Sequence, residues 1–122
     1  MIPNHPPHFA IIGAGTAGLA TAILLARQNI QVSILEKASE LEPVGAGLLL
    51  QPSGLAVFEH LGLLDEVLRL GAKVTGLKGQ LPSGNLLVNS HYQQAHPDFY
   101  GVGIHRATLC HVLENKCREY SE

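Results

Sequence analysis

Basic residues are scarce and scattered in this sequence. Eight Lys and Arg residues stand against ten Asp and Glu residues among 122, which gives a formal net charge of −2 and a pI near 6.4. A nucleic-acid surface needs clustered basic side chains, so this composition argues against nucleic acid as a partner. The length suits one small domain and leaves little room for a separate substrate domain.

Cysteine is equally rare. Cys110 and Cys117 lie in one segment with helical periodicity, where seven positions correspond to about 10 Å along the helix axis, too far for a disulfide. We therefore expect two reduced thiols and a cytoplasmic location. The seven histidines include no pair at ligand spacing beside a third donor, and we predict no metal site.

No charged residue occurs between positions 9 and 26. A hydropathy window would mark this stretch as a membrane span or a signal sequence. Three glycines interrupt the stretch, no basic segment precedes it, and Arg27 follows it. These features favour a buried strand, a tight turn and a buried helix, so we expect no membrane contact.

The three glycines form the motif Gly13-x-Gly15-x-x-Gly18 after an apolar run. In a dinucleotide-binding turn the first glycine permits the tight turn, the second lets a pyrophosphate approach the backbone, and the third lets the helix pack close to the strand. Free N–H groups at the helix start, among them those of Thr16 and Ala17, meet the phosphate charge. The motif therefore predicts a pyrophosphate site.

A second apolar run, residues 31–36, ends in Glu36, 18 residues after the last glycine. The helical stretch 16–28 between the two runs makes them parallel strands of a βαβ unit. Because residues 10–12 are apolar without alternation, we expect the first strand to be covered on both faces. A carboxylate at the end of the second strand accepts hydrogen bonds from a ribose and repels a 2′-phosphate, which favours FAD or NAD over NADP.

Downstream of this unit no second βαβ unit follows. The expected elements are a loop at 37–47, a helix at 54–61 with Ser53 as N-cap, a helix at 64–70, a hairpin with strands 74–81 and 86–89, a loop at 91–99, a strand at 101–105 and a helix at 107–120. Asn29 is the expected C-cap of the first helix. The predicted fold class is α/β, an incomplete Rossmann-like domain made of a βαβ unit, a helical segment, a β-hairpin and a C-terminal helix. The first strand keeps an unpaired apolar edge, so we expect self-association or a complementing chain.

The order and spacing of four segments are specific: residues 11–37 with the glycine motif, 44–53 (VGAGLLLQPS), 61–63 (LGL) and 104–109 (IHRATL). Together they resemble the FAD-dependent aromatic hydroxylases, which are flavoprotein monooxygenases of the salicylate and p-hydroxybenzoate hydroxylase type. The resemblance implies tightly but non-covalently bound FAD. It also implies NAD(P)H as co-substrate and a small aromatic molecule as substrate.

The same resemblance implies further cofactor contacts. In that family the arginine matching Arg106 reaches FAD from the start of its helix. The segment matching 45–49 runs along the cofactor near the flavin, which makes Gly47 and Leu49 candidate contacts. Lys37, directly after Glu36, completes the candidate set. A solvated arginine, a flexible loop glycine and a core leucine are the alternatives at Arg106, Gly47 and Leu49.

The later motifs of that family do not occur in this sequence. Neither its Asp-Gly motif nor its Gly-Asp motif is present in these 122 residues, and we expect them to contain no substrate domain. We therefore expect residues 1–122 to be the N-terminal part of an FAD-binding domain, without turnover by itself. We assign no catalytic base, since His105 and His111 are interpreted as a strand-end and a helix-face residue. Two alternatives stay open: an NAD-binding half-domain of a dehydrogenase, and a non-catalytic module derived from a flavoprotein.

Overall fold

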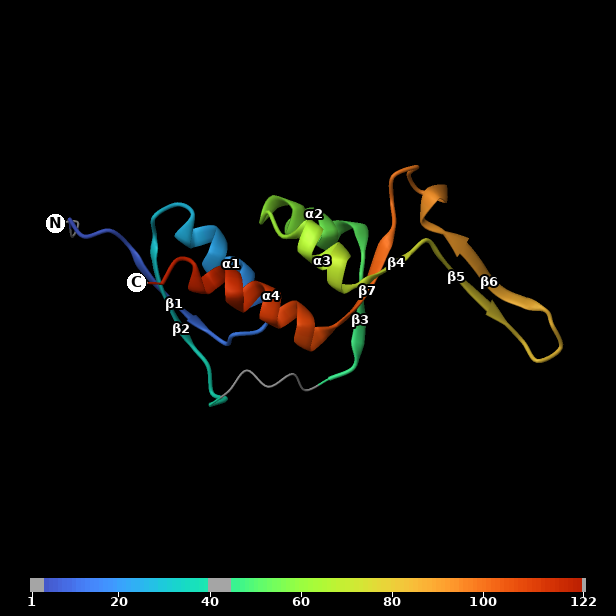
Figure 1. The fold of residues 1–122 in the computed structure, drawn as a ribbon, viewed down its shortest axis with the longest axis horizontal. Coiled ribbons are helices and arrows are strands. Elements are labelled where there is room, and N and C mark those ends of the chain that lie inside the picture. Colours follow the sequence, from blue (N-terminus) through green and yellow to red (C-terminus); the bar gives the residue numbers. More distant parts are fainter. Residues whose placement is uncertain (1–3, 40–44, 122) are drawn as a thin grey trace. The chain divides into compact units, whose positions relative to one another are not determined.

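The computed structural model describes residues 4–39 and 45–121. In chain order the elements are β1 (His8–Ile12), α1 (Thr16–Ala26), β2 (Gln31–Leu35), β3 (Gly47–Leu50), α2 (Pro52–His60), α3 (Leu64–Leu70), β4 (Ala72–Val74), β5 (Gly76–Gln80), β6 (Leu86–His91), a 3₁₀ turn (Tyr92–Gln94), β7 (Gly101–His105) and α4 (Arg106–Arg118) (Figure 1). They form two compact units. The first holds the described residues up to Gly45 and those from Arg106 onward, and the second is Ala46–His105.

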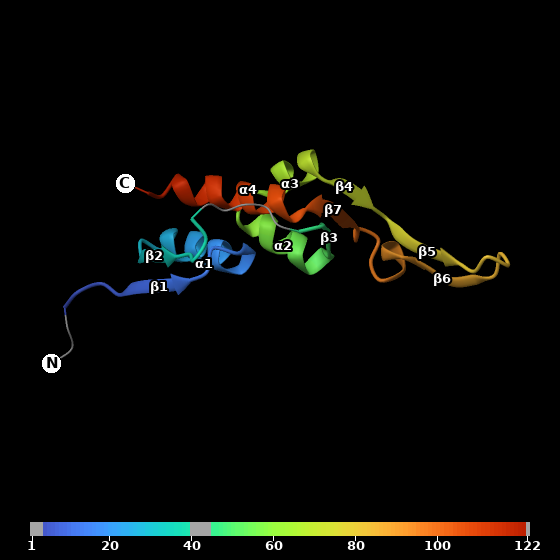
Figure 2. The same cartoon turned by 90° about the horizontal axis from the view of Figure 1, so that it is seen from below.

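The first unit contains the predicted βαβ arrangement. β1 and β2 are parallel, with Phe9 opposite Val32 and Ile12 opposite Leu35, and α1 connects them. α4 packs beside α1 (Figures 1 and 2). The apolar side chains buried on these two helices are Leu19, Ala22 and Ile23 of α1, and Leu109, Val112 and Leu113 of α4. The helix predicted at 107–120 is confirmed with slightly different bounds.

The prediction that β1 is covered on both faces is wrong. Four of its five residues are exposed, and Ile12 exposes 87 % of its surface. α1 lies over the face that carries Ile11, and a Cβ added to Gly18 of α1 would lie 3.3 Å from Ile11 Cγ2. The opposite face carries Ile12 and Leu35 without a covering element in the described part of the chain. An unbroken apolar run shows that a strand can be buried, but the burial itself needs a second layer.

The second unit is organised around β7. This strand pairs antiparallel with β3 on one side and with β4 on the other, and its residues Val102 and Ile104 are buried together with Leu55, Phe58, Leu61 and Val67. The strand at 101–105 and the helix at 64–70 are confirmed as predicted. Neither β3 nor β4 was predicted as a separate strand: only Gly47 of β3 fell in the predicted loop, and only Val74 of β4 fell in the predicted hairpin. Strands of three or four residues give no recognisable period.

The predicted hairpin is confirmed, with somewhat different bounds. β5 and β6 are antiparallel, Leu77 lies opposite Ser90, and an irregularity falls at Gly79/Gln80. All six residues of β6 are exposed. The loop expected at 91–99 contains the short 3₁₀ turn. No helix in the described residues is long and apolar enough to cross a membrane.

Two predicted helix caps are corrected. The N-cap of α2 is Gln51 rather than Ser53, because Pro52 suits the first helical turn, where its missing N–H has no partner to lose. The C-cap of α1 is Arg27. Asn29 follows two residues later with φ of 58°, the left-handed conformation that Asn tolerates, so it terminates the helix from just beyond the cap.

Candidate functional site

The glycine turn between β1 and α1 has the geometry that its three glycines predict. Gly13 has φ of +103°, which strains any other residue, and its N–H donates to the Leu35 carbonyl at 2.7 Å. A Cβ on Gly18 would collide with the Gly13 carbonyl oxygen, so only glycine lets α1 approach the turn this closely. A Cβ on Gly15 would meet no described atom within 4 Å. The backbone at Gly15 is therefore open to a ligand.

The start of α1 lacks the groups that usually satisfy a helix N-terminus. Gly15 is the N-cap, and within the described structure no side chain caps the helix and no acidic residue lies in its first turn. The N–H groups of Thr16, Ala17 and Gly18 have no intrahelical acceptor at this position. An uncapped N-terminus with its positive dipole end favours an anion. The turn can therefore hold a phosphate group.

Glu36, directly after β2, lies against this turn. Its Oε2 accepts a hydrogen bond from the Ala14 amide at 2.7 Å, and its Oε1 accepts one from the Ala38 amide at 3.1 Å. The Ala14 bond, followed by the Ala38 bond, lowers the pKa of Glu36 below its ordinary value of 4.5. The carboxylate is thus ionised at neutral pH and lies beside the glycine turn, where a ribose acceptor is expected.

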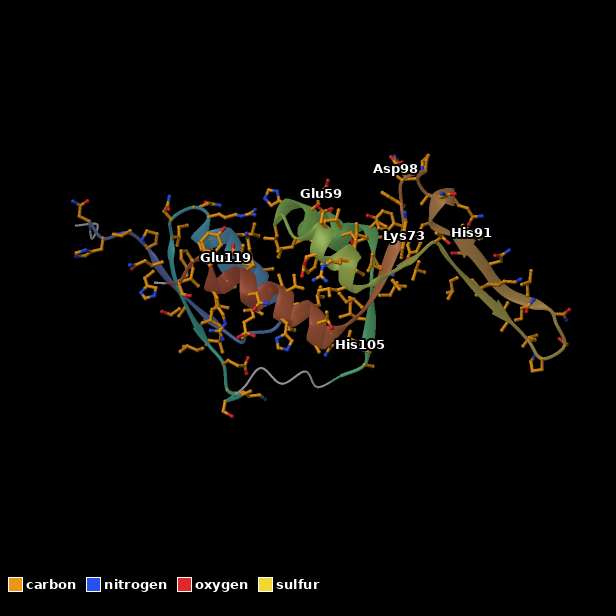
Figure 3. The ribbon with its side chains drawn as sticks, viewed as in Figure 1. Glu59, Lys73, His91, Asp98, His105 and Glu119 are labelled. Carbon is orange, nitrogen blue, oxygen red and sulfur yellow. The ribbon has the colours of Figure 1, made fainter. Side chains whose placement is uncertain are left out.

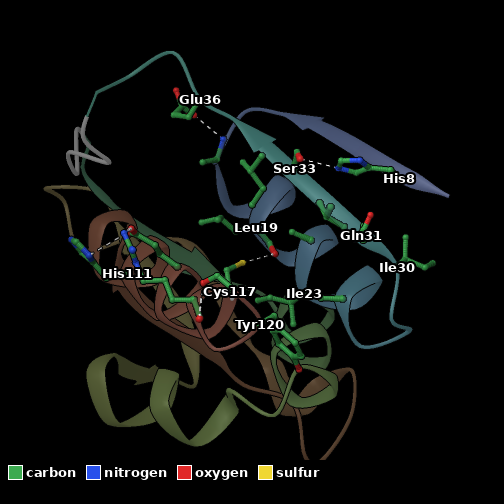
Figure 4. A pocket seen from close by; sticks show the side chains of 18 of the residues that line it. His8, Leu19, Ile23, Ile30, Gln31, Ser33, Glu36, His111, Cys117 and Tyr120 are labelled. Carbon is green, nitrogen blue, oxygen red and sulfur yellow. Dashed lines mark hydrogen bonds and ion pairs between the residues drawn. The ribbon is translucent and has the colours of Figure 1, made fainter. Parts of the chain in front are cut away.

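A groove of 1390 Å³ in the first unit opens beside this site (Figure 4). Ala14, Glu36, Ala38 and Ser39 line one end of it. The remainder runs along β2 between α1 and α4, where its polar lining includes His8, Ser33, His111, Glu114 and Arg118. Only the end at Ala14 and Glu36 coincides with the predicted cofactor site.

The other predicted contacts fall in both units. Arg106 is the first residue of α4, and a Cβ on Gly45 would lie 3.7 Å from its Cδ. Lys37 is exposed next to Glu36. Gly47 and Leu49 lie on β3 in the second unit, and Leu49 exposes 43 % of its surface. The structure thus brings Gly13–Gly18 and Glu36 together, and the cofactor-binding roles of these residues and of the other four stay predictions.

A family model described as an FAD binding domain matches residues 8–116, most of the chain. The chain belongs to this FAD-binding family. The match agrees with the fold class and with the resemblance to FAD-dependent aromatic hydroxylases. It supports FAD as the cofactor, and it counts against the half-domain of an ordinary NAD-dependent dehydrogenase.

Curated relatives point to the same group of proteins. The chain is 38 % identical over 104 residues to the 3-hydroxybenzoate 6-hydroxylase of Klebsiella oxytoca, covering 81 % of the chain and 26 % of the relative. It is 33 % identical over 108 residues to the 3-amino-4-hydroxybenzoate 2-monooxygenase of Streptomyces cremeus, covering 85 % and 27 %. A solved 2-methyl-3-hydroxypyridine-5-carboxylic acid oxygenase matches with a TM-score of 0.84 and 28 % identity over 97 % of the chain and 30 % of that protein. The chain therefore spans under a third of the length of these three proteins.

The sequence prediction missed two backbone amides that donate to Glu36. Ala14 and Ala38 contribute through their N–H groups, which every residue except proline has, so no side-chain signal marks them. Ala14 exposes only 6 % of its surface. Its place between the two glycines of the motif is the one hint that the sequence offers.

Histidine and cysteine side chains offer no catalytic arrangement in the described residues. His105 is exposed at the end of β7 (Figure 3), and His111 is exposed on α4 with its Nδ1 3.9 Å from Glu114 Oε2, as predicted. Both thiols are free, and burial raises the pKa of Cys110 and of Cys117, which keeps them protonated. Among the described residues no group of three metal-ligating side chains is found.

Proposed function

We propose that this chain binds the adenosine and pyrophosphate half of FAD, tightly and without a covalent bond. The observation that carries the proposal is the uncapped start of α1, where a strained glycine turn leaves the backbone open at Gly15. The N–H groups of Thr16, Ala17 and Gly18 would hold the pyrophosphate, and Glu36 would accept hydrogen bonds from the ribose hydroxyls.

The surrounding residues fit this cofactor. None of the residues in the first turn of α1 is acidic. Glu36 is anionic, which suits the two hydroxyls of an adenosine ribose and opposes a 2′-phosphate. Arg106 and Lys37 add positive charge to the same unit, and we propose that they contact the cofactor. Gly47 and Leu49 are proposed as contacts on the resemblance alone.

We further propose that the chain is the N-terminal part of an NAD(P)H-dependent flavoprotein monooxygenase. The relatives named as hydroxylases and monooxygenases of hydroxybenzoates support a small aromatic substrate. FAD, when bound, supplies the redox and oxygen chemistry of such a reaction. The residues of this chain bind and orient the cofactor, and we expect no turnover from them alone. The two free thiols favour the reducing cytoplasm.

Equilibrium titration of the purified chain with FAD, ADP and FMN tests the binding proposal. FAD is expected to bind, ADP to compete with it, and FMN to bind much more weakly because it lacks the adenosine. A 2′-phosphorylated ADP should bind more weakly than ADP because Glu36 repels its extra charge. A folded chain that takes up neither FAD nor ADP would contradict the proposal. Tighter binding of NAD than of FAD would favour the dehydrogenase alternative.

We also propose that the chain self-associates, or pairs with a complementing chain, through β1 and β2. Ile12 and Leu35, opposite each other on the uncovered face, expose 87 % and 57 % of their surfaces, and exposed apolar strands promote association. Size-exclusion chromatography should show a mass above that of one chain. A stable, well-folded monomer would refute this.

A further inference from the structure

The carboxylate of Glu36 joins two loops before any ligand is present. One oxygen accepts from Ala14, in the turn after β1, and the other accepts from Ala38, in the loop after β2. Figure 4 shows the side chain reaching across to the turn. A residue whose one task is to bind a ribose needs neither contact.

We propose that Glu36 is a positioning residue for the glycine turn, which it holds in the phosphate-binding conformation through the Ala14 amide, in addition to its role as a ribose acceptor. The consequence for the cofactor rests on the proposed FAD function, whereas the effect on the turn does not. Loss of the carboxylate should therefore weaken binding of the pyrophosphate as well as of the ribose.

The turn needs such support because of its backbone conformation. Gly13 has φ of +103°, and a glycine costs more conformational entropy to fix than any other residue. Its own N–H is fixed by the Leu35 carbonyl, but the next amide, that of the buried Ala14, has Glu36 as its partner. A buried amide that loses its acceptor destabilises the fold, because the N–H group stays desolvated without a hydrogen-bond partner. The Glu36 bond thus fixes the peptide between the first two glycines.

Both tasks are compatible on one carboxylate. An ionised carboxylate offers about four lone-pair positions, and the two amides use one on each oxygen. Ribose hydroxyls can therefore be added without displacing Ala14. The hydrogen bond from Ala14 is also the largest cause of the lowered pKa of Glu36.

Amide hydrogen exchange of the cofactor-free chain tests the positioning role. In Glu36→Ala the Ala14 amide should exchange roughly ten- to a hundredfold faster, as expected for loss of a charge-assisted hydrogen bond. Glu36→Gln should lie between, because its single amide oxygen can accept from only one of the two loops. Glu59→Ala, on the exposed surface of α2 (Figure 3), is the matched control and should leave Ala14 unchanged. Unaltered Ala14 exchange in Glu36→Ala would overturn the proposal.

A variant that unfolds is recognised because the amides of the buried Ile23 and Leu109 lose their protection from exchange. In that case the proposal is tested on the unmodified chain. A scalar coupling across the hydrogen bond, from the Ala14 amide nitrogen to the Glu36 carboxyl carbon, should be detectable there. Its absence, in a chain with protected Ile23, would count against the proposal.

Nucleotide affinities distinguish the effect of Glu36 on the glycine turn from its contact with the ribose. If Glu36 acts on both, Glu36→Ala should weaken 2′,3′-dideoxy-ADP, which lacks the ribose hydroxyls, by about tenfold and ADP by more. If Glu36 acts on the ribose alone, only ADP loses affinity, and the positioning role is refuted. Failure of the unmodified chain to bind either nucleotide would contradict the proposed FAD function, and amide exchange would still judge the role of Glu36.

Discussion

Replacement of Gly18 by alanine is expected to break the close approach of α1 to the glycine turn. The new Cβ would collide with the Gly13 carbonyl oxygen and lie 3.3 Å from Ile11 Cγ2. The first of these is a backbone atom, so no side-chain rotation relieves the collision and the helix must move. Overpacking of this kind costs about 1–3 kcal/mol. Because the colliding atom belongs to the backbone, the upper end of this range applies. The better helix propensity of alanine returns about 1 kcal/mol at most, so the expected net loss is about 2 kcal/mol.

Gly15→Ala is the matched control, because it adds the same methyl group three residues earlier. Gly15 has φ of −78° and an extended backbone that alanine accepts, and its Cβ would meet no described atom within 4 Å. Glycine is a better N-cap than alanine by roughly 0.5–1 kcal/mol. The Gly15 variant should therefore be clearly more stable than the Gly18 variant, yet it should still lose FAD because the methyl group occupies the approach to the turn.

Urea unfolding followed by circular dichroism measures the stability of both variants. With a slope of about 2 kcal/mol per molar urea, the Gly18 variant should unfold at roughly 1 M less urea than the unmodified chain. FAD titration of the folded variants supplies the second readout. An unchanged unfolding midpoint for Gly18→Ala, or unchanged FAD affinity for Gly15→Ala, would refute the assigned role of that glycine.

Further perturbations address other parts of the structure. The Ala14 bond lowers the pKa of Glu36 in the folded chain, so the stabilisation is complete above the ordinary value of 4.5 and is lost as pH falls through the lower folded value. The urea midpoint should drop there, and Glu36→Gln should remove that part of the drop. Gly71→Ala should destabilise the chain by about 1–3 kcal/mol in urea, because its Cβ would collide with the buried β7. Gly54→Ala, in α2 with only an ordinary contact at 3.4 Å, should instead raise the free energy of unfolding by up to about 1 kcal/mol. Ile23→Ala, at a fully buried position of α1, should cost about 2–5 kcal/mol, and Ile23→Val about 0.5–1.5 kcal/mol, in the same assay.

The glycine turn and its flanking elements were predictable because their requirements are local. Gly13 needs a backbone that other residues avoid, and Gly18 needs a missing side chain, so both leave a mark in the sequence. Helical periodicity likewise located α3 and α4 within a residue or two. Local signals failed at Ser53, because the proline beside it begins the helix and Gln51 becomes the N-cap of α2.

Strand pairing between distant segments was harder to predict from the sequence. β3 and β4 are too short to show a period, and they are strands because β7, far along the chain, supplies their hydrogen-bond partners. The exposure of β1 was missed for a related reason. Its apolar composition shows that its side chains could be buried, whereas the arrangement of the other elements decides whether they are covered.

The sequence by itself determined the βαβ unit, the uncapped helix start and an acid at the end of the second strand, since each follows from residue type and spacing. Only the tertiary structure decided that this acid binds the turn. The parallel register of β1 and β2 places the loops that follow them side by side, and the contact from Glu36 to Ala14 depends on that register. Its partner is a backbone amide, which every non-proline residue has, so no pattern of side chains could have indicated it.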